Sequence, residues 1–143
     1  MPILRKLSDM KDMFLNANGV QDDTLIYSYD NIIPSDTCED LLHGITTLYP
    51  GNINGEYFMT KGHKHINNRA EVYYGLEGTC KVLCESENDT YVTTLTKGEV
   101  VYVKPGYAHR VINTSEEICK FFCVCTGDAG HDYNVTFKTR FLK

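Results

Sequence analysis

Several features that would mark a membrane or secreted protein are missing from this chain. It has no long apolar run, and its first residues, MPILRKLSDMKDMF, resemble neither a signal peptide nor a membrane span. No CxxC pair occurs among the six cysteines, so a thiolate zinc site is not indicated. We therefore expect a cytoplasmic protein whose cysteines stay reduced.

Positive charge is also in short supply. The formal net charge of −5 argues against nucleic acid or an anionic membrane surface as a partner, although a local anion site remains compatible with it. The hydrophobic fraction of 42% and charged fraction of 23% are those of a globular protein. A chain of 143 residues can bury one sizeable core and is too short for two ordinary domains.

No helical pattern is long enough to support a parallel βαβ sheet. From residue 25 onward, short runs rich in Val, Ile, Thr, Tyr and Phe alternate with turn residues at roughly the 8–12-residue spacing of an antiparallel sandwich or barrel. The sequence thus predicts an all-β protein with one domain, residues 1–143. Within it we expect an N-terminal arm over 1–24, with a short helix around 8–15 capped by Ser8 or Asp9, and a β-barrel over 25–143.

Five of the cysteines fall in the strand-like runs. A small buried thiol is the ordinary reason for a cysteine in such a run, and the Cys123/Cys125 spacing is only a weak metal signal. We expect buried, unpaired thiols at Cys80, Cys84, Cys119, Cys123 and Cys125.

The stretch KGHKHINNRAEVYYGLEG gathers imidazoles and a carboxylate. Side chains at i and i+2 share one face of a strand, so His63 and His65 point the same way, as do Glu71 and Tyr73. A third histidine, His109, follows the turn at Pro105–Gly106. By contrast His43 has no partner in view, and we expect it to be exposed or hydrogen-bonded.

Three imidazoles and one carboxylate suit a borderline divalent ion. Fe(II), Mn(II), Ni(II) and Zn(II) accept such a donor set, whereas calcium and magnesium prefer oxygen ligands. Four protein ligands around a six-coordinate ion would leave two neighbouring positions for adjacent oxygens of a substrate.

The pattern resembles the two motifs of the cupin superfamily. His63, His65, Glu71 and Gly78 match the first motif, and Gly98, Gly106, His109 and Asn113 match the second. The expected fold is therefore a cupin, a double-stranded β-helix or jelly-roll barrel. Further phrases resemble the cupin-type phosphoglucose isomerases: RKLSDM, TTLYPG, GEYFMTKGHKH, RAEVY, VVYVKPGYAHR and DAGHDY.

This resemblance implies a homodimeric cytosolic enzyme that interconverts glucose 6-phosphate and fructose 6-phosphate, in glycolysis and gluconeogenesis, with one divalent metal per subunit, usually Fe(II). It assigns metal ligation to His63, His65, Glu71 and His109. Catalytic roles fall on Glu71, Tyr73 and His131. Substrate contacts fall on Tyr27, Thr46, Thr60, Gly62 and Tyr133, with the phosphate on the two threonines and the glycine. Cys125 stands where the family usually has a tyrosine.

Two other readings stay open. The same ligands could serve another cupin sugar-phosphate isomerase or an iron-dependent dioxygenase, because one barrel hosts many chemistries. A non-catalytic cupin that binds a sugar phosphate is the third reading, and the behaviour of Glu71 variants would separate it from an enzyme.

Overall fold

The structure is a computed structural model that describes residues 1–143, and it is built almost entirely of strands. The strand-rich runs of the sequence each form a strand, which confirms the all-β prediction. The strands are β1 Ile3–Lys6, β2 Leu25–Ile32, β3 Leu41–Leu48, β4 Asn52–Ile53, β5 Glu56–Tyr57, β6 Glu71–Glu77, β7 Thr79–Glu85, β8 Thr90–Thr96, β9 Val100–Val103, β10 Ala108–Ile112 and β11 Cys119–Thr126.

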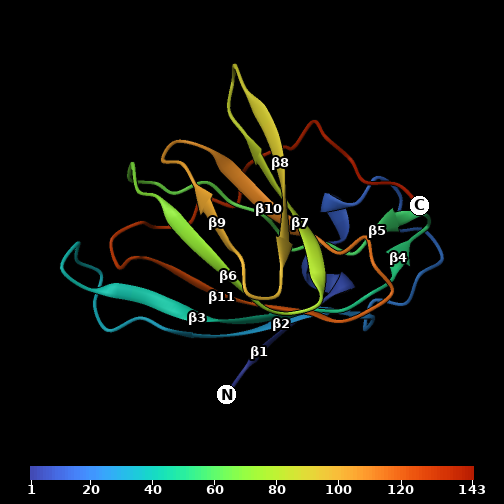
Figure 1. Ribbon diagram of the computed structural model, residues 1–143. Helices are drawn as coiled ribbons and strands as arrows, with labels where there is room; N and C mark the ends of the chain where they lie inside the picture. The colour runs from blue at the N-terminus through green and yellow to red at the C-terminus, as the bar shows by residue number, and fades with distance from the viewer.

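The strands make two facing sheets and a small hairpin. The larger sheet has the order β1-β2-β3-β11-β6-β9, and the smaller has the order β10-β7-β8. All pairings within them are antiparallel. The smaller sheet stands over the larger one, and the β4-β5 hairpin lies at one side (Figure 1).

The tight connection between β6 and β7 depends on one glycine. Gly78 has φ +71°, a backbone conformation that side-chain-bearing residues rarely adopt. A Cβ there would lie 2.2 Å from the carbonyl oxygen of Ile118. The chain can therefore pass from the larger sheet to the smaller one in a single residue.

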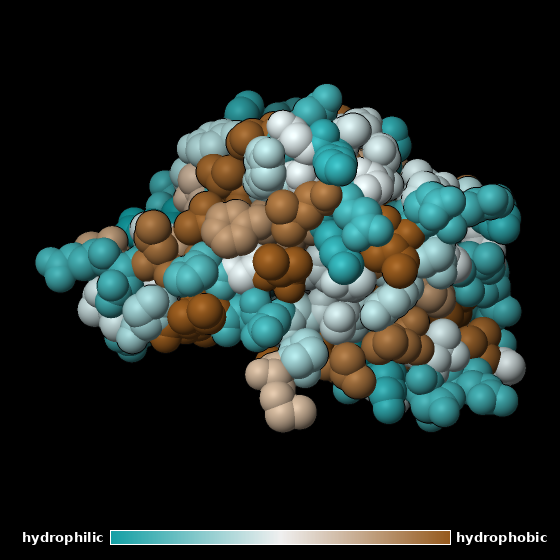
Figure 2. Space-filling view, turned by 60° about the horizontal axis from the view of Figure 1, so that its bottom comes forward, coloured by the Kyte–Doolittle hydropathy of each residue, from teal (hydrophilic) through white to brown (hydrophobic).

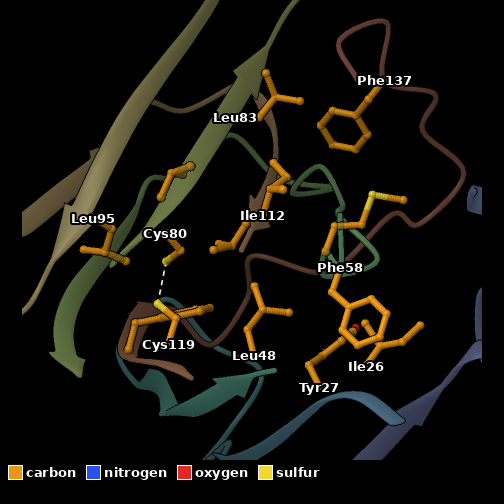
Figure 3. Close-up of a cluster of buried hydrophobic side chains, with 14 of the residues drawn as sticks. Ile26, Tyr27, Leu48, Phe58, Cys80, Leu83, Leu95, Ile112, Cys119 and Phe137 are labelled. Atoms are coloured by element: carbon orange, nitrogen blue, oxygen red, sulfur yellow. Dashed lines mark hydrogen bonds between the residues drawn. The ribbon is translucent and has the colours of Figure 1, made fainter. Parts of the chain in front are cut away.

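The core fills the space between the sheets. Along β11 every second residue is buried, which places Phe121 and Cys123 inside. Ile26 and Leu48 from the larger sheet face Leu83 from the smaller one, and Cys80 meets Cys119 across the gap (Figure 3). The five strand cysteines are buried and unpaired, as predicted.

The N-terminal arm differs from the expectation. No α-helix forms around 8–15; instead two 3-10 turns, Leu7–Asp9 and Lys11–Met13, follow β1, and the first is capped at Lys6 rather than at Ser8 or Asp9. Asp9 accepts the Lys6 N–H at 2.8 Å. Because β1 pairs with β2, part of the expected arm belongs to the larger sheet. No helix here is long and apolar enough to cross a membrane.

Candidate metal centre and substrate pocket

Four potential metal ligands converge between the two sheets. Glu71 opens β6 of the larger sheet, and His109 lies on β10 of the smaller one. His63 and His65 come from the extended stretch before β6, which is held by paired backbone bonds between His63 and His109. One donor atom from each of the four residues lies within 4.8 Å of the others.

A single carboxylate oxygen forms the centre of this group. Glu71 Oε1 lies 3.0 Å from His65 Nε2, 3.1 Å from His109 Nε2 and 3.8 Å from His63 Nε2. Glu71, His65 and His109 are buried, at 4%, 6% and 1% exposure. Water therefore does little to screen the charges inside the group.

The hydrogen bonds of the outer ring nitrogens set the histidine tautomers. His65 Nδ1 lies 2.8 Å from the carbonyl of Arg69, and His109 Nδ1 lies 3.1 Å from the carbonyl of Tyr107. A carbonyl only accepts, so both Nδ1 atoms carry a proton, and both rings turn Nε2, the nitrogen left to bind a metal, toward the Glu71 carboxylate.

In the metal-binding state, with Nε2 unprotonated, the ring lone pairs and the carboxylate would repel one another unless a cation lay between them. The Nε2 atom of His63 is also buried and has no hydrogen-bond partner in the protein. A buried polar atom without a partner is costly, and a metal ion would satisfy it. The four residues thus fit a divalent transition metal.

Burial and contacts shift the pKa values of this group in a consistent way. Burial lowers the pKa of His63 to about 3, so its ring is neutral at neutral pH. Burial alone would raise the pKa of Glu71, but its contacts with the His109, His63 and His65 rings hold that pKa well below its ordinary value. Neutral imidazoles beside an ionised carboxylate are the protonation states that bind metal.

A pocket opens directly above these ligands. It brings together all seven residues that the sequence predicted around the substrate, and three of the four metal-ligand candidates, His63, Glu71 and His109, form part of its wall. The seven are Tyr27, Thr46, Thr60, Gly62, Tyr73, His131 and Tyr133.

Thr60 to Gly62 form a rigid ledge in this pocket. Arg110 donates from Nε to the Thr60 carbonyl at 3.1 Å and from its guanidinium to the Lys61 carbonyl at 2.7 Å. The Thr60 hydroxyl accepts the Val111 N–H at 3.1 Å and keeps its own proton to donate. The N–H of Gly62 has no acceptor in the protein.

Arg110 is a site residue that the sequence reading missed. It is 4% exposed, stacks 4.3 Å from the Phe137 ring, and has its pKa lowered to about 10 by burial. The available signal was its position next to His109 in an otherwise apolar strand, where a charged side chain needs a buried partner.

The DAGHDY segment brings His131 over the metal-ligand candidates. The His131 ring lies 4.2 Å from the His63 ring, and the Tyr133 ring lies 5.7 Å from it. The segment is anchored at Asp128, which accepts two hydrogen bonds from Arg69 at 3.0 and 2.8 Å. Backbone bonds join Asp132 to the Lys64 position.

Tyr73 lies deep in the wall, 6.2 Å from the His109 ring and 5.2 Å from Phe121. Burial, and then the charge of Glu71, raise its pKa well above the ordinary value, so its hydroxyl remains protonated. The tyrosine can therefore donate a proton in a hydrogen bond but does not serve as a base.

Three other residues that the sequence singled out lie outside the pocket wall and make contacts that stabilise the fold. Cys125 packs with Leu42 and Ala129 and is not part of the pocket wall. Asn113 donates to the carbonyls of Leu48 and Glu117, so it fixes a turn. His43 is hydrogen-bonded to the Leu41 carbonyl at 2.9 Å, as expected for a histidine outside the site.

The architecture and the ligand cluster define the class of protein as a cupin barrel. An oxalate oxidase in complex with glycolate has the same fold at a TM-score of 0.63 and 13% identity, over 76% of this chain and 55% of that one. A cupin 2 conserved barrel domain protein from Salinispora arenicola matches with a TM-score of 0.53 and 18% identity, over 82% of this chain and 83% of that one. At these identities the likeness shows the fold, and the predicted cupin architecture is confirmed.

Sequence similarity then narrows the class to one family. The model of the glucose-6-phosphate isomerase (GPI) family matches residues 4–142. A glucose-6-phosphate isomerase of Thermococcus kodakarensis is 37% identical over 147 residues, which is 99% of this chain and 78% of the relative. The chain belongs to the glucose-6-phosphate isomerase family, and the predicted class of enzyme, an isomerase, is confirmed.

Proposed function

We propose that this chain interconverts glucose 6-phosphate and fructose 6-phosphate with one divalent transition metal, Fe(II), bound per subunit. Its place in metabolism would be glycolysis and gluconeogenesis in the cytoplasm. The observation that supports the proposal most directly is the His63–His65–Glu71–His109 group at the wall of a pocket that also holds hydroxyls and a free backbone N–H. Family membership favours this isomerase over a dioxygenase or a passive binder.

One group of pocket residues would act on the reacting end of the substrate, and another would bind its phosphate end. The three histidines and Glu71 would hold the metal, which stabilises negative charge on the substrate's O1 and O2. The hydroxyls of Thr46 and Thr60 and the N–H of Gly62 bind the phosphate. Two ends bound at once would fix the sugar chain in the reactive geometry.

Hydrogen transfer between C2 and C1 is assigned to Glu71. Its carboxylate takes the proton from C2 and returns it to C1 through a cis-enediol, while a second proton passes from O2 to O1 and Tyr73 donates a hydrogen bond that orients the carboxylate. His131, above the His63 ring, moves the proton of the ring oxygen when the sugar opens. A direct hydrogen shift from C2 to C1 is the alternative, and complete retention of a C2 tritium label at C1 would count against the proton transfer.

The proposal as a whole is tested by removing and returning metal. We expect chelated protein to lose at least about 95% of its fructose 6-phosphate conversion, because the carboxylate and three lone pairs then repel instead of holding an ion. Returning Fe(II), Mn(II), Ni(II) or Zn(II) one at a time should restore conversion to different extents in a coupled assay. Full activity of the chelated protein, with metal absent by elemental analysis, would overturn the metal-dependent mechanism.

We also propose that two copies associate through the outer face of the larger sheet. An apolar stripe crosses four strands there, because Ile45 pairs with Phe122, Phe122 with Tyr74, and Tyr74 with Val100. Ile45, Tyr74 and Val100 are exposed. Apolar side chains gather among polar ones on the face turned forward in Figure 2. A stripe crossing four strands offers the self-complementary surface that a twofold dimer needs.

Phe122→Glu should dissociate this dimer, because a buried charge at the centre of an interface weakens association by about 100-fold or more. The molecular mass measured by sedimentation equilibrium should then fall from that of a dimer to the 16.3 kDa of a single chain. Val92→Glu is the control, since Val92 is an exposed apolar residue on the smaller sheet, away from the stripe. A monomeric parent, or a Phe122→Glu protein of unchanged mass, would refute the interface.

A further inference from the structure

We propose that Arg5, Tyr29 and Lys61 form a cationic mouth on the substrate pocket that binds the phosphate group of the sugar phosphate. The proposal deepens the function above and rests on it. None of these three residues was assigned a role from the sequence. Tyr29 and Lys61 belong to the pocket wall, and Arg5, on β1, donates a hydrogen bond to the Tyr29 hydroxyl.

The strand register turns these side chains inward. Arg5 lies directly opposite Tyr27 in the β1–β2 pair, and Tyr29 lies directly opposite Thr46 in the β2–β3 pair. Directly paired residues share a face of the sheet. Because Tyr27 and Thr46 line the pocket, Arg5 and Tyr29 project to the same side.

The Arg5 guanidinium is held at the rim but not neutralised. It donates to the Tyr29 hydroxyl at 2.9 Å and stacks over that ring at 5.4 Å. Its Nε–H is buried and has no hydrogen-bond partner. Phenol and ring contacts orient a guanidinium without cancelling its charge, so one donor and the full positive charge remain for a ligand.

Lys61 brings a second unpaired charge to the same place. Its ammonium lies 5.5 Å from the Tyr133 ring, and its backbone N–H donates to the Tyr27 hydroxyl at 3.3 Å. Lys61 and Arg5 lie beside the same pair of tyrosines. The Tyr27 ring, whose hydroxyl accepts the Lys61 N–H, stacks 6.2 Å from the Tyr29 ring that holds Arg5. Neither Arg5 nor Lys61 is among the cations that form a salt bridge with a carboxylate.

Two neighbouring cations without a carboxylate repel each other, and a bound dianion would relieve that repulsion. A phosphate monoester carries about two negative charges and accepts from guanidinium, ammonium and hydroxyl groups together. The Tyr29 hydroxyl adds a phenol to this pocket, whereas Cys125 lies outside its wall. In a chain of net charge −5 this local positive field also draws anions to the pocket mouth.

The test compares Arg5→Met and Lys61→Met with Lys64→Met as the matched control. Lys64 lies three residues from Lys61, and its exposed side chain is outside this pocket. Calorimetric titration with inorganic phosphate should show about 10- to 100-fold weaker binding for each pocket variant, and binding within about 2-fold of the parent for Lys64→Met. With glucose 6-phosphate, KM should rise by a similar factor while kcat changes by less than about 3-fold.

Conservative variants separate a charge effect from a packing effect. Arg5→Lys should recover most of the phosphate affinity, and Tyr29→Phe should keep the stack while losing about 3- to 10-fold in affinity. Unchanged phosphate affinity and KM in both methionine variants would overturn the inference, as would equal losses in Arg5→Lys and Arg5→Met. If the parent lacked isomerase activity, the titration would still decide the anion site, so the two proposals can fail separately.

Discussion

Replacing Glu71 by glutamine is expected to lower kcat by about 1,000-fold, with KM for glucose 6-phosphate changing by less than about 5-fold. Glutamine keeps the size of the side chain, and its amide can donate to one imidazole Nε2, but it cannot take a proton from C2. Substrate affinity should persist because the phosphate contacts lie on other strands. The coupled conversion assay measures both constants, with metal content determined on the same samples.

The matched control for this change lies on the same strand. Glu77, at the far end of β6, is exposed and pairs only with Lys120 at 3.7 Å, so Glu77→Gln should behave as the parent does. If Glu71→Gln keeps its metal and turns over at the rate of the parent, the carboxylate has only a structural role. The variant could instead lose its metal together with its activity. In that case, exchange of the C2 hydrogen with solvent during the remaining turnover shows whether the carboxylate carries a proton.

The strands could be predicted from the sequence because alternation is a local rule, whereas the four candidate metal ligands were assigned with the help of the cupin resemblance. Alternation along β6 placed Glu71 and Tyr73 on one face, and the structure buries both of them. His63 and His65 obeyed the same rule. Only the third imidazole required a long-range contact, and the Pro105–Gly106 turn before His109 marked where the next strand begins.

The failures share a physical cause, since each depends on contacts between segments far apart in the chain. The 8–15 stretch has helical spacing, but pairing of β1 with β2 takes the chain into the sheet and leaves room only for 3-10 turns. The sequence hinted that Arg110 needs a buried partner but could not name it, because its two acceptors belong to residues about 50 positions earlier. Arg5 reaches the Tyr29 hydroxyl, 24 residues later in the chain, only because β1 pairs with β2.

A second large effect is expected from Gly62→Ala, in the ledge beside the metal-ligand candidates. Gly62 has φ +75°, and a Cβ there would lie 2.6 Å from the Phe137 ring and 3.1 Å from Arg110 Cβ. Left-handed backbone costs alanine about 1–2 kcal/mol, and overpacking adds about 1–3 kcal/mol. We expect the free energy of unfolding to fall by about 2–5 kcal/mol, as measured by urea denaturation.

Gly62→Ala should also lower activity for a reason separate from stability, because the clash with the Phe137 ring displaces residues 60–62. The Gly62 N–H, which has no acceptor in the protein, would turn away from the phosphate, and kcat/KM for glucose 6-phosphate should fall by about 100-fold even where the variant is fully folded. Gly55→Ala is the control: Gly55 has φ +91° but nothing within 4 Å of its Cβ position, so only the backbone cost of about 1–2 kcal/mol applies. A Gly62→Ala enzyme with the stability and kcat/KM of Gly55→Ala would show that the ledge tolerates displacement and does not bind the phosphate. Loss of stability without loss of kcat/KM would leave the glycine a purely structural role.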